Sequence, residues 1–264
     1  MTTRKPLVVL GAFDPEMRAI EELVLTHGHF VIEARSKGKR VTSRTAYEAD
    51  IPDCEDEQIW VECRPRNGFG ERKVLIVDHH LPGDPGYGGP AHMYWQASSL
   101  GQICAILGQE PTNRLRMIAA ADHCLSAAYR GECPGINPKR LCEWRVSSRA
   151  AFQRRSTTDV MADIQSTIRL LKQAPRLELG GESVADLRIC QRAISEVAEA
   201  TAMTGIPCLV LGHHKGKVRL VGSRGPAVRR FLRNQVPGIE LTGLYGDPAR
   251  GFAGGYKHEK PYAE

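Results

Sequence analysis

Short runs of apolar residues alternate with amphipathic segments through the first half of the chain. The runs predict buried strands at 6–13, 30–35, 58–63 and 73–77. Apolar positions spaced by three and four residues predict helices at 15–28, 93–108 and 113–131. Strands that are apolar throughout and alternate with helices are typical of a parallel sheet. The polar stretch 36–57 is compatible with either a short helix or a loop.

The pattern becomes less regular in the second half. A stretch rich in arginine and serine (145–160) predicts a solvated linker, and two amphipathic segments predict long helices at 159–173 and roughly 182–203. The remaining pattern predicts a hairpin of two strands (206–212 and 218–223), a helix (225–235), a strand (239–246) and a glycine-rich loop (247–264). We expect an α/β protein in three parts: a parallel-sheet domain (1–150), a linker with connecting helices (151–204) and a smaller mixed α/β domain (205–264).

Composition narrows the classes of protein that fit. A hydrophobic fraction of 42% in 264 residues is enough for a buried core, and the net charge of +6 favours anionic ligands such as phosphates or nucleotides. The sequence has no membrane-length apolar run and no signal-peptide pattern at its start, so we expect a cytoplasmic protein with no membrane partner. The eight cysteines are scattered without a CxxC pair, which favours buried thiols over disulfides or a zinc ribbon.

Polar residues with metal-binding capacity follow the predicted strands or lie in the third predicted helix. They are Asp14, Glu16, Glu62, Asp78, His79, His80 and Asp122. Ligands bind beyond the carboxyl ends of the strands in a parallel sheet, where these side chains are expected to meet. Carboxylates combined with imidazole suit Mn²⁺ or a similar divalent ion, and two such ions can hold a phosphoryl group and generate a hydroxide.

Four segments resemble, in order, the motifs of the DHH phosphoesterase superfamily. They are "VDHH" (77–80), "QASSLGQICAIL" (96–107), "VRLVGSRG" (218–225) and "GFAGGYKH" (251–258). The superfamily includes RecJ-type exonucleases, oligoribonucleases, cyclic-dinucleotide phosphodiesterases and family II pyrophosphatases. The resemblance implies a metal-binding domain followed by a substrate-binding domain, with the active-site cleft between them.

The resemblance also implies a set of metal ligands, namely Asp14, Glu16, Glu62, His79 and Asp122. One metal position keeps four of these ligands, all except Asp14. The other keeps Asp14 and Glu62 but lacks its imidazole, because Leu10 stands where the family's first motif has histidine. The chain is therefore expected to hold one or two ions of Mn²⁺ or Mg²⁺, or none if the substitution is decisive.

The remaining roles also follow from the resemblance. Asp78 would support the site, and His80 would face the substrate and donate a proton to the leaving group. The smaller domain would bind the substrate phosphate through Arg224, Gly254, Gly255 and His258. The implied function is hydrolysis of a phosphoester in a nucleotide or short oligonucleotide, and the alternative is a non-catalytic relative that binds a phosphorylated ligand. The sequence leaves open whether the protein forms a homodimer.

Simpler interpretations remain for several of these residues. Asp14 precedes Pro15 and can cap a helix without binding metal. Glu62 and Arg224 can be solvated strand-end side chains. A plain nucleic-acid-binding protein would rest only on the net charge and on four arginines of the predicted linker, Arg145, Arg149, Arg154 and Arg155.

Overall fold

The computed structural model describes residues 5–54, 57–214, 216–248 and 250–258. The chain forms two compact units, residues 1–141 and 142–264. The division falls before the predicted boundary at 150 because one helix, α5 (Pro138–Gln153), begins in unit 1 and continues into unit 2. None of the helices in the described ranges combines the length and apolarity that a membrane span requires.

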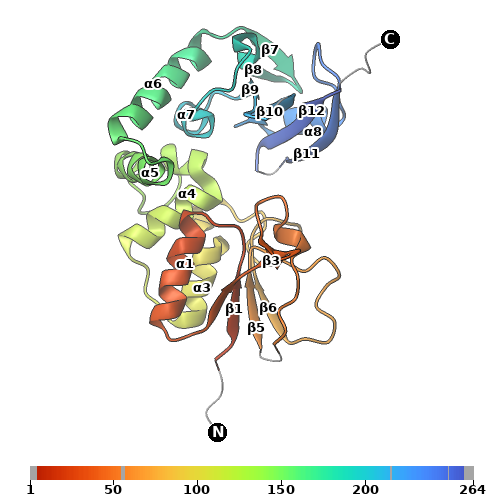
Figure 1. Cartoon of the computed structure of the whole chain (residues 1–264). Coiled ribbons are helices and arrows are strands. Elements are labelled where there is room, and N and C mark those ends of the chain that lie inside the picture. Colours follow the sequence, from red (N-terminus) through yellow and green to blue (C-terminus); the bar gives the residue numbers. More distant parts are fainter. Residues whose placement is uncertain (1–4, 55–56, 215, 249, 259–264) are drawn as a thin grey trace. The chain divides into compact units, whose positions relative to one another are not determined.

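Unit 1 contains the predicted parallel sheet, with strand order β2-β1-β5-β6 (Figure 1). The strands are β1 (Leu7–Leu10), β2 (Val31–Glu33), β5 (Gln58–Val61) and β6 (Val74–Val77). Leu10 pairs with Val61, and Val61 pairs with Val77. Because this register aligns the carboxyl ends of three strands, the residues that follow each strand emerge at one edge of the sheet.

Both faces of this sheet are covered, which explains why its strands are mostly apolar. On one face lie the helices α1 (Pro15–Thr26) and α3 (Ser99–Leu107), which pack against each other. On the other face, Leu7, Val9 and Trp60 pack against residues from the stretch that sequence patterns left open. That stretch forms a small hairpin, β3 (Arg35–Ser36) with β4 (Lys39–Arg40), and a single 3₁₀ turn (Ala46–Glu48).

The two remaining predicted helices of unit 1 are present with local irregularities. The segment predicted as one helix at 93–108 contains a short helix α2 (Tyr94–Ala97) and then α3. Ser98 separates them in an extended conformation, and its hydroxyl accepts a hydrogen bond from the Gly101 N–H. The next helix, α4 (Asn113–Tyr129), departs from helical backbone angles at Cys124.

Unit 2 is built on a mixed six-stranded sheet of order β11-β12-β10-β9-β8-β7. Its strands are β7 (Arg176–Leu179), β8 (Glu182–Asp186), β9 (Cys208–Leu211), β10 (Lys217–Val221), β11 (Leu241–Asp247) and β12 (Phe252–Lys257). The helices α6 (Thr157–Gln173) and α7 (Val197–Thr204) pack on one face through a cluster that includes Leu171 and Val197. The helix α8 (Gly225–Leu232) covers the other face.

The helix predicted at roughly 182–203 is wrong up to residue 196. This part begins with β8 and a short 3₁₀ helix (Leu187–Cys190), and only its end forms α7. Gly180 and Gly181 both adopt positive φ and make the turn between β7 and β8, an antiparallel pair. Val184 and Ala185 are then buried in a sheet that the helical spacing does not anticipate. The segment 151–204 is therefore more than a linker, since it supplies two strands of the unit 2 sheet.

The arginine-rich stretch 145–160 is also not a solvated linker, because most of it is helical. In α5, Arg145 binds the buried carboxylate of Glu199 at 2.8 Å, and Arg149 binds that of Glu196. These two arginines stabilise the packing of α5 against the segment around α7. They are therefore committed to acids within unit 2 rather than arranged as a nucleic-acid track.

Candidate metal centre

Helix α1 brings two carboxylates to the carboxyl edge of the unit 1 sheet. Asp14 caps the helix, and its Oδ1 accepts a hydrogen bond from the Met17 N–H at 2.8 Å. Glu16 follows in the first turn, and only 1% of its surface is exposed. Its Oε1 accepts a hydrogen bond from the Leu100 N–H at 3.0 Å, in the first turn of α3. A helix N-terminus favours negative charge, so α3 holds this carboxylate in place.

Glu62 reaches the same edge through an unusual backbone conformation. It follows β5 directly and has φ of +50°, in the left-handed region that costs free energy for any residue other than glycine. Its N–H still bonds to the Val77 carbonyl at 3.0 Å, so the conformation belongs to an ordered strand end. Gly11 allows the close approach of β1, because a Cβ there would lie 2.5 Å from the Glu62 carbonyl oxygen.

Asp78 is buried and fully engaged by the residues that follow it. Its Oδ1 accepts hydrogen bonds from the backbone N–H groups of His79 and His80 and from the His80 Nδ1, at 2.7, 3.0 and 2.9 Å. Its Oδ2 accepts one from the Tyr47 hydroxyl at 3.0 Å. Burial alone would raise the pKa of Asp78, but the hydrogen bond and charge of His80, with the backbone N–H groups, lower it. A charged Asp78 therefore fixes the His80 ring with Nδ1 as the donor.

Asp84 supports the same turn from the loop beyond the histidines. It is 6% exposed, and its Oδ2 accepts hydrogen bonds from the N–H groups of His80 and Leu81 at 3.0 and 2.6 Å. Arg64 binds its other oxygen. Neither Asp84 nor Tyr47 was identified from the sequence. Both act through contacts that depend on the folded loop rather than on a motif.

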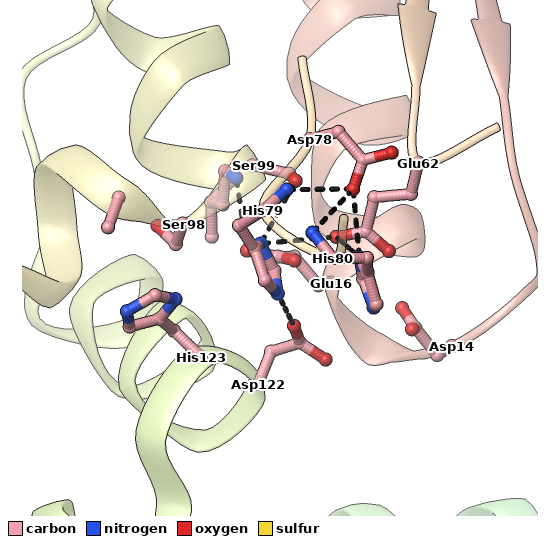
Figure 2. Close-up of polar contacts among 12 residues, drawn as sticks. Asp14, Glu16, Glu62, Asp78, His79, His80, Ser98, Ser99, Asp122 and His123 are labelled. Atoms are coloured by element: carbon pink, nitrogen blue, oxygen red, sulfur yellow. Dashed lines mark hydrogen bonds and ion pairs between the residues drawn. The ribbon is translucent and has the colours of Figure 1, made fainter. Parts of the chain in front are cut away.

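Four side chains converge in the interior of this edge. One ligand atom from each of Glu16, Glu62, His79 and Asp122 lies within 4.8 Å of all the others. The His79 Nε2 is 3.2 Å from Asp122 Oδ2, and its Nδ1 is 3.6 Å from Glu62 Oε1. Figure 2 shows the carboxylates of these acids gathered around the His79 ring. A second, overlapping set consists of Glu62, His79 and His80.

The electrostatics of this cluster favour a cation. Burial, followed by repulsion from Asp122, raises the pKa of both Glu16 and Glu62 well above the usual value. One oxygen of each, Glu16 Oε2 and Glu62 Oε1, is buried with no hydrogen-bond partner among the described residues. A buried carboxylate oxygen without a hydrogen-bond partner is costly, and a divalent ion would satisfy both of these oxygens. Three carboxylates and an imidazole fit such an ion, although they do not identify which metal it is.

The other predicted ligand position is less complete. Asp14 lies beside the cluster (Figure 2) but belongs to neither ligand set. Leu10 is 1% exposed within β1 and offers no donor atom. His123 contacts the edge of the His79 ring, with ring centroids 5.1 Å apart, and its Nε2 donates to the Gly89 carbonyl at 2.9 Å. In the sequence, only the position of His123 beside Asp122 indicates that it lies near the site.

The four predicted substrate-binding residues lie in unit 2, and the structure corrects how they were expected to act. Gly254 and Gly255 are in β12, not in a loop, and a Cβ at Gly254 would lie 2.3 Å from the Tyr245 hydroxyl. These glycines therefore allow close side-chain packing in a strand that is paired on both sides.

Arg224 and His258 are also not brought together. Ser223, next to Arg224, bonds to Gly251 at the start of β12, whereas His258 follows the end of that strand. The two residues therefore lie near opposite ends of β12, and the structure does not place them side by side. The Arg224 side chain is 88% exposed and approaches Glu182 only at 3.9 Å.

No protein-family model matches the chain, and no curated protein or solved structure matches it either. The DHH resemblance therefore rests on the sequence motifs, and the function it implies is taken up below as a proposal.

The metal-free protein is expected to lose stability as the pH rises from about 4 to about 7. Burial and the charge of Asp122 raise the pKa of Asp14 from 3.8 to about 7, so the folded chain binds more protons than the unfolded chain in this range. Urea unfolding in the presence of a chelator would measure this slope. Asp14→Asn keeps the helix cap and should flatten the slope, and an unchanged slope would show that Asp14 does not cause it.

Proposed function

We propose that this protein is a metal-dependent phosphoesterase whose centre lies at the carboxyl edge of the unit 1 sheet. One observation carries the proposal: the ligand atoms of Glu16, Glu62, His79 and Asp122 lie within 4.8 Å of one another in a largely buried cluster. His80 borders that cluster. The DHH motifs and the positive net charge support a phosphorylated substrate, for which we propose a nucleotide or short oligonucleotide.

The four clustered residues would hold the ion, Mn²⁺ or Mg²⁺. When bound, it would polarise a phosphoryl oxygen and lower the pKa of a water molecule. The chain's own residues then have separate tasks. Asp78 accepts the Nδ1 hydrogen bond of His80 and so fixes the ring orientation. The His80 side chain is 23% exposed, and its Nε2 can donate a proton to the leaving-group oxygen.

The ligand sets favour one tightly bound ion. The four-residue cluster has enough protein ligands to bind an ion tightly. The second set adds only His80, because it shares Glu62 and His79 with the cluster. Leu10 contributes no donor where a further imidazole would complete a second position. We propose that any second ion binds more weakly, with Asp14 and His80 as the nearest additional donors.

Leu10 also favours one alternative, a non-catalytic protein that binds a phosphorylated ligand at this edge. If productive chemistry needs two firmly held ions, the loss of that imidazole leaves binding without turnover. This alternative predicts that the phosphorylated ligand binds without hydrolysis and that its binding does not depend on the divalent ion.

A combined assay distinguishes the two. Protein stripped with a chelator would be reloaded with Mn²⁺ or Mg²⁺, and bound metal would be counted by mass spectrometry. The same samples would be tested on nitrophenyl phosphate mono- and diesters, a cyclic dinucleotide and a short RNA. We expect about one firmly bound ion per chain and turnover that disappears in the chelator. Absence of turnover on every substrate would favour the alternative, and absence of bound ion would contradict the proposed phosphoesterase.

A further inference from the structure

A cavity of about 490 Å³ in unit 2 lies away from every residue discussed as a ligand or catalytic group. Its walls are the turn between β7 and β8 and the outer face of α8. The side chains that line it carry charge: Arg229, Arg230 and Arg233, with Glu178 as the single acid. A cavity of this volume is in the range of small-ligand sites, and three of the seven residues that line it are arginines.

The arginines are presented by a helix whose other face is fixed in the core. Ala227, Val228 and Phe231 of α8 are fully buried against the unit 2 sheet. Arg229, Arg230 and Arg233 are therefore held on the exposed side, and the first and last of these are one helical turn apart. The packing of α8 determines where the guanidinium groups can reach.

The opposite wall is equally constrained. Gly180 has φ of +63°, and a Cβ at this position would lie 2.7 Å from the backbone nitrogen of Ala227. The turn therefore rests directly on the first turn of α8, and no larger residue fits between them. Gly181, at φ of +78°, completes the turn and lines the cavity. This wall of the cavity is therefore fixed by backbone contacts.

None of these three arginines forms an ion pair within the part of the chain that the structure describes. Other arginines of the same unit do so, such as Arg145 with Glu199 and Arg188 with Asp186. The residues that line the cavity carry three positive charges and one negative charge, and the excess positive charge is unfavourable without a counter-ion. An anion in the cavity would balance that charge.

We propose that this cavity, hereafter the arginine cavity, is a binding site for a ligand with two or more linked phosphate groups. A guanidinium presents paired N–H donors that match phosphate oxygens, and three of them can engage successive phosphates. The linked phosphates belong either to a free polyphosphate or nucleotide or to the backbone of a nucleic-acid strand. The proposal rests on unit 2 alone and does not depend on the function proposed for the metal centre.

The test measures binding to the full chain in a chelator, so that neither metal binding nor hydrolysis contributes. The probes are inorganic tripolyphosphate, by calorimetry, and a fluorescent single-stranded oligonucleotide, by anisotropy over a range of salt. The variant R229Q/R230Q/R233Q is compared with R154Q/R169Q/R192Q. The control changes the same number of exposed arginines in the same unit, at positions outside the cavity.

The cavity variant is expected to bind at least one probe about tenfold more weakly or worse, with the control close to wild type. If the oligonucleotide is the ligand, losing up to three phosphate contacts lowers the slope of log affinity against log salt by up to about 2. Weakening for tripolyphosphate alone would assign the site to a free phosphorylated molecule.

A further variant, R229K/R230K/R233K, separates guanidinium geometry from charge. It should bind more weakly than wild type but better than the glutamine variant. If the cavity and control glutamine variants bind the probes equally weakly, net charge alone explains the effect and the proposal is overturned. The proposal is also overturned if the wild type binds neither probe. Matching thermal unfolding of all variants would confirm that the fold is intact.

Discussion

His79→Ala is expected to lower the affinity of the protein for a divalent ion by at least about 100-fold and to remove the proposed phosphoesterase turnover. The reason is geometric, because His79 belongs to both ligand sets and lies between Asp122 and Glu62. Loss of a supporting residue alone typically costs 10- to 100-fold in affinity, and a direct ligand costs more. Competition with a fluorescent chelator would measure the change. His92→Ala, at an exposed histidine of the same unit, is the matched control.

The neighbouring histidine should behave differently. His80→Ala leaves the four-residue cluster intact, so the ion stays bound while kcat falls by about 10²- to 10⁴-fold, the usual contribution of a general acid. Loss of tight ion binding in His80→Ala would place this residue among the essential ligands. Unchanged kcat would exclude it from the chemistry. The pair of variants thus separates the metal-holding task from the proton-donating task at adjacent positions.

A bound divalent ion is expected to raise the unfolding temperature of unit 1 by about 5–10 °C. An ion at a hundredfold excess over its Kd stabilises the folded state by about 2.7 kcal/mol. For units of this size, each kcal/mol shifts the unfolding temperature by about 2–4 °C or more. The physical origin is the cluster of carboxylates, in which burial and the charge of Asp122 raise the pKa of Glu16 and Glu62. Calorimetry with and without Mn²⁺ would measure the shift.

Glu16→Gln makes this prediction specific. The amide removes one buried negative charge, so the metal-free variant should unfold at a higher temperature than the metal-free wild type. The same change removes a ligand, so the shift caused by Mn²⁺ should shrink or vanish. Glu132→Gln, at an exposed acid, should keep the full shift. Equal shifts in the wild type and in Glu16→Gln would mean that the ion stabilises the protein from somewhere else.

Sequence patterns predict unit 1 well because its signals are local and mutually consistent. Apolar strands, amphipathic helices and polar residues at strand ends all agree with a parallel sheet, and the register then brings the ends together. The resemblance to the DHH motifs implies one set of ligands, and the structure places its members, Glu16, Glu62, His79 and Asp122, in one cluster. What the sequence could not provide is the backbone of Glu62, since a positive φ at a glutamate has no local signature.

Unit 2 was predicted less well because tertiary contacts outweigh local preference there. Glycines in "GFAGGYKH" indicate a loop when considered alone, yet the close packing of Tyr245 over Gly254 accounts for them in a strand. The spacing of apolar residues at 182–203 indicates a helix. The turn at Gly180 and Gly181 instead pairs the first residues of this segment with β7. The arginines of α5 seemed free because their partners, Glu196 and Glu199, are distant in sequence.

Because Glu62 has a left-handed backbone, stability of the metal-free fold and metal binding favour different residues at this position. Glycine would adopt this conformation without strain and would also remove a buried carboxylate, so Glu62→Gly should favour the metal-free fold. A library of variants screened only for heat resistance would therefore enrich glycine at position 62. A library screened for an ion-dependent trait would retain an acid. The residue that survives there would report which of the two pressures acted.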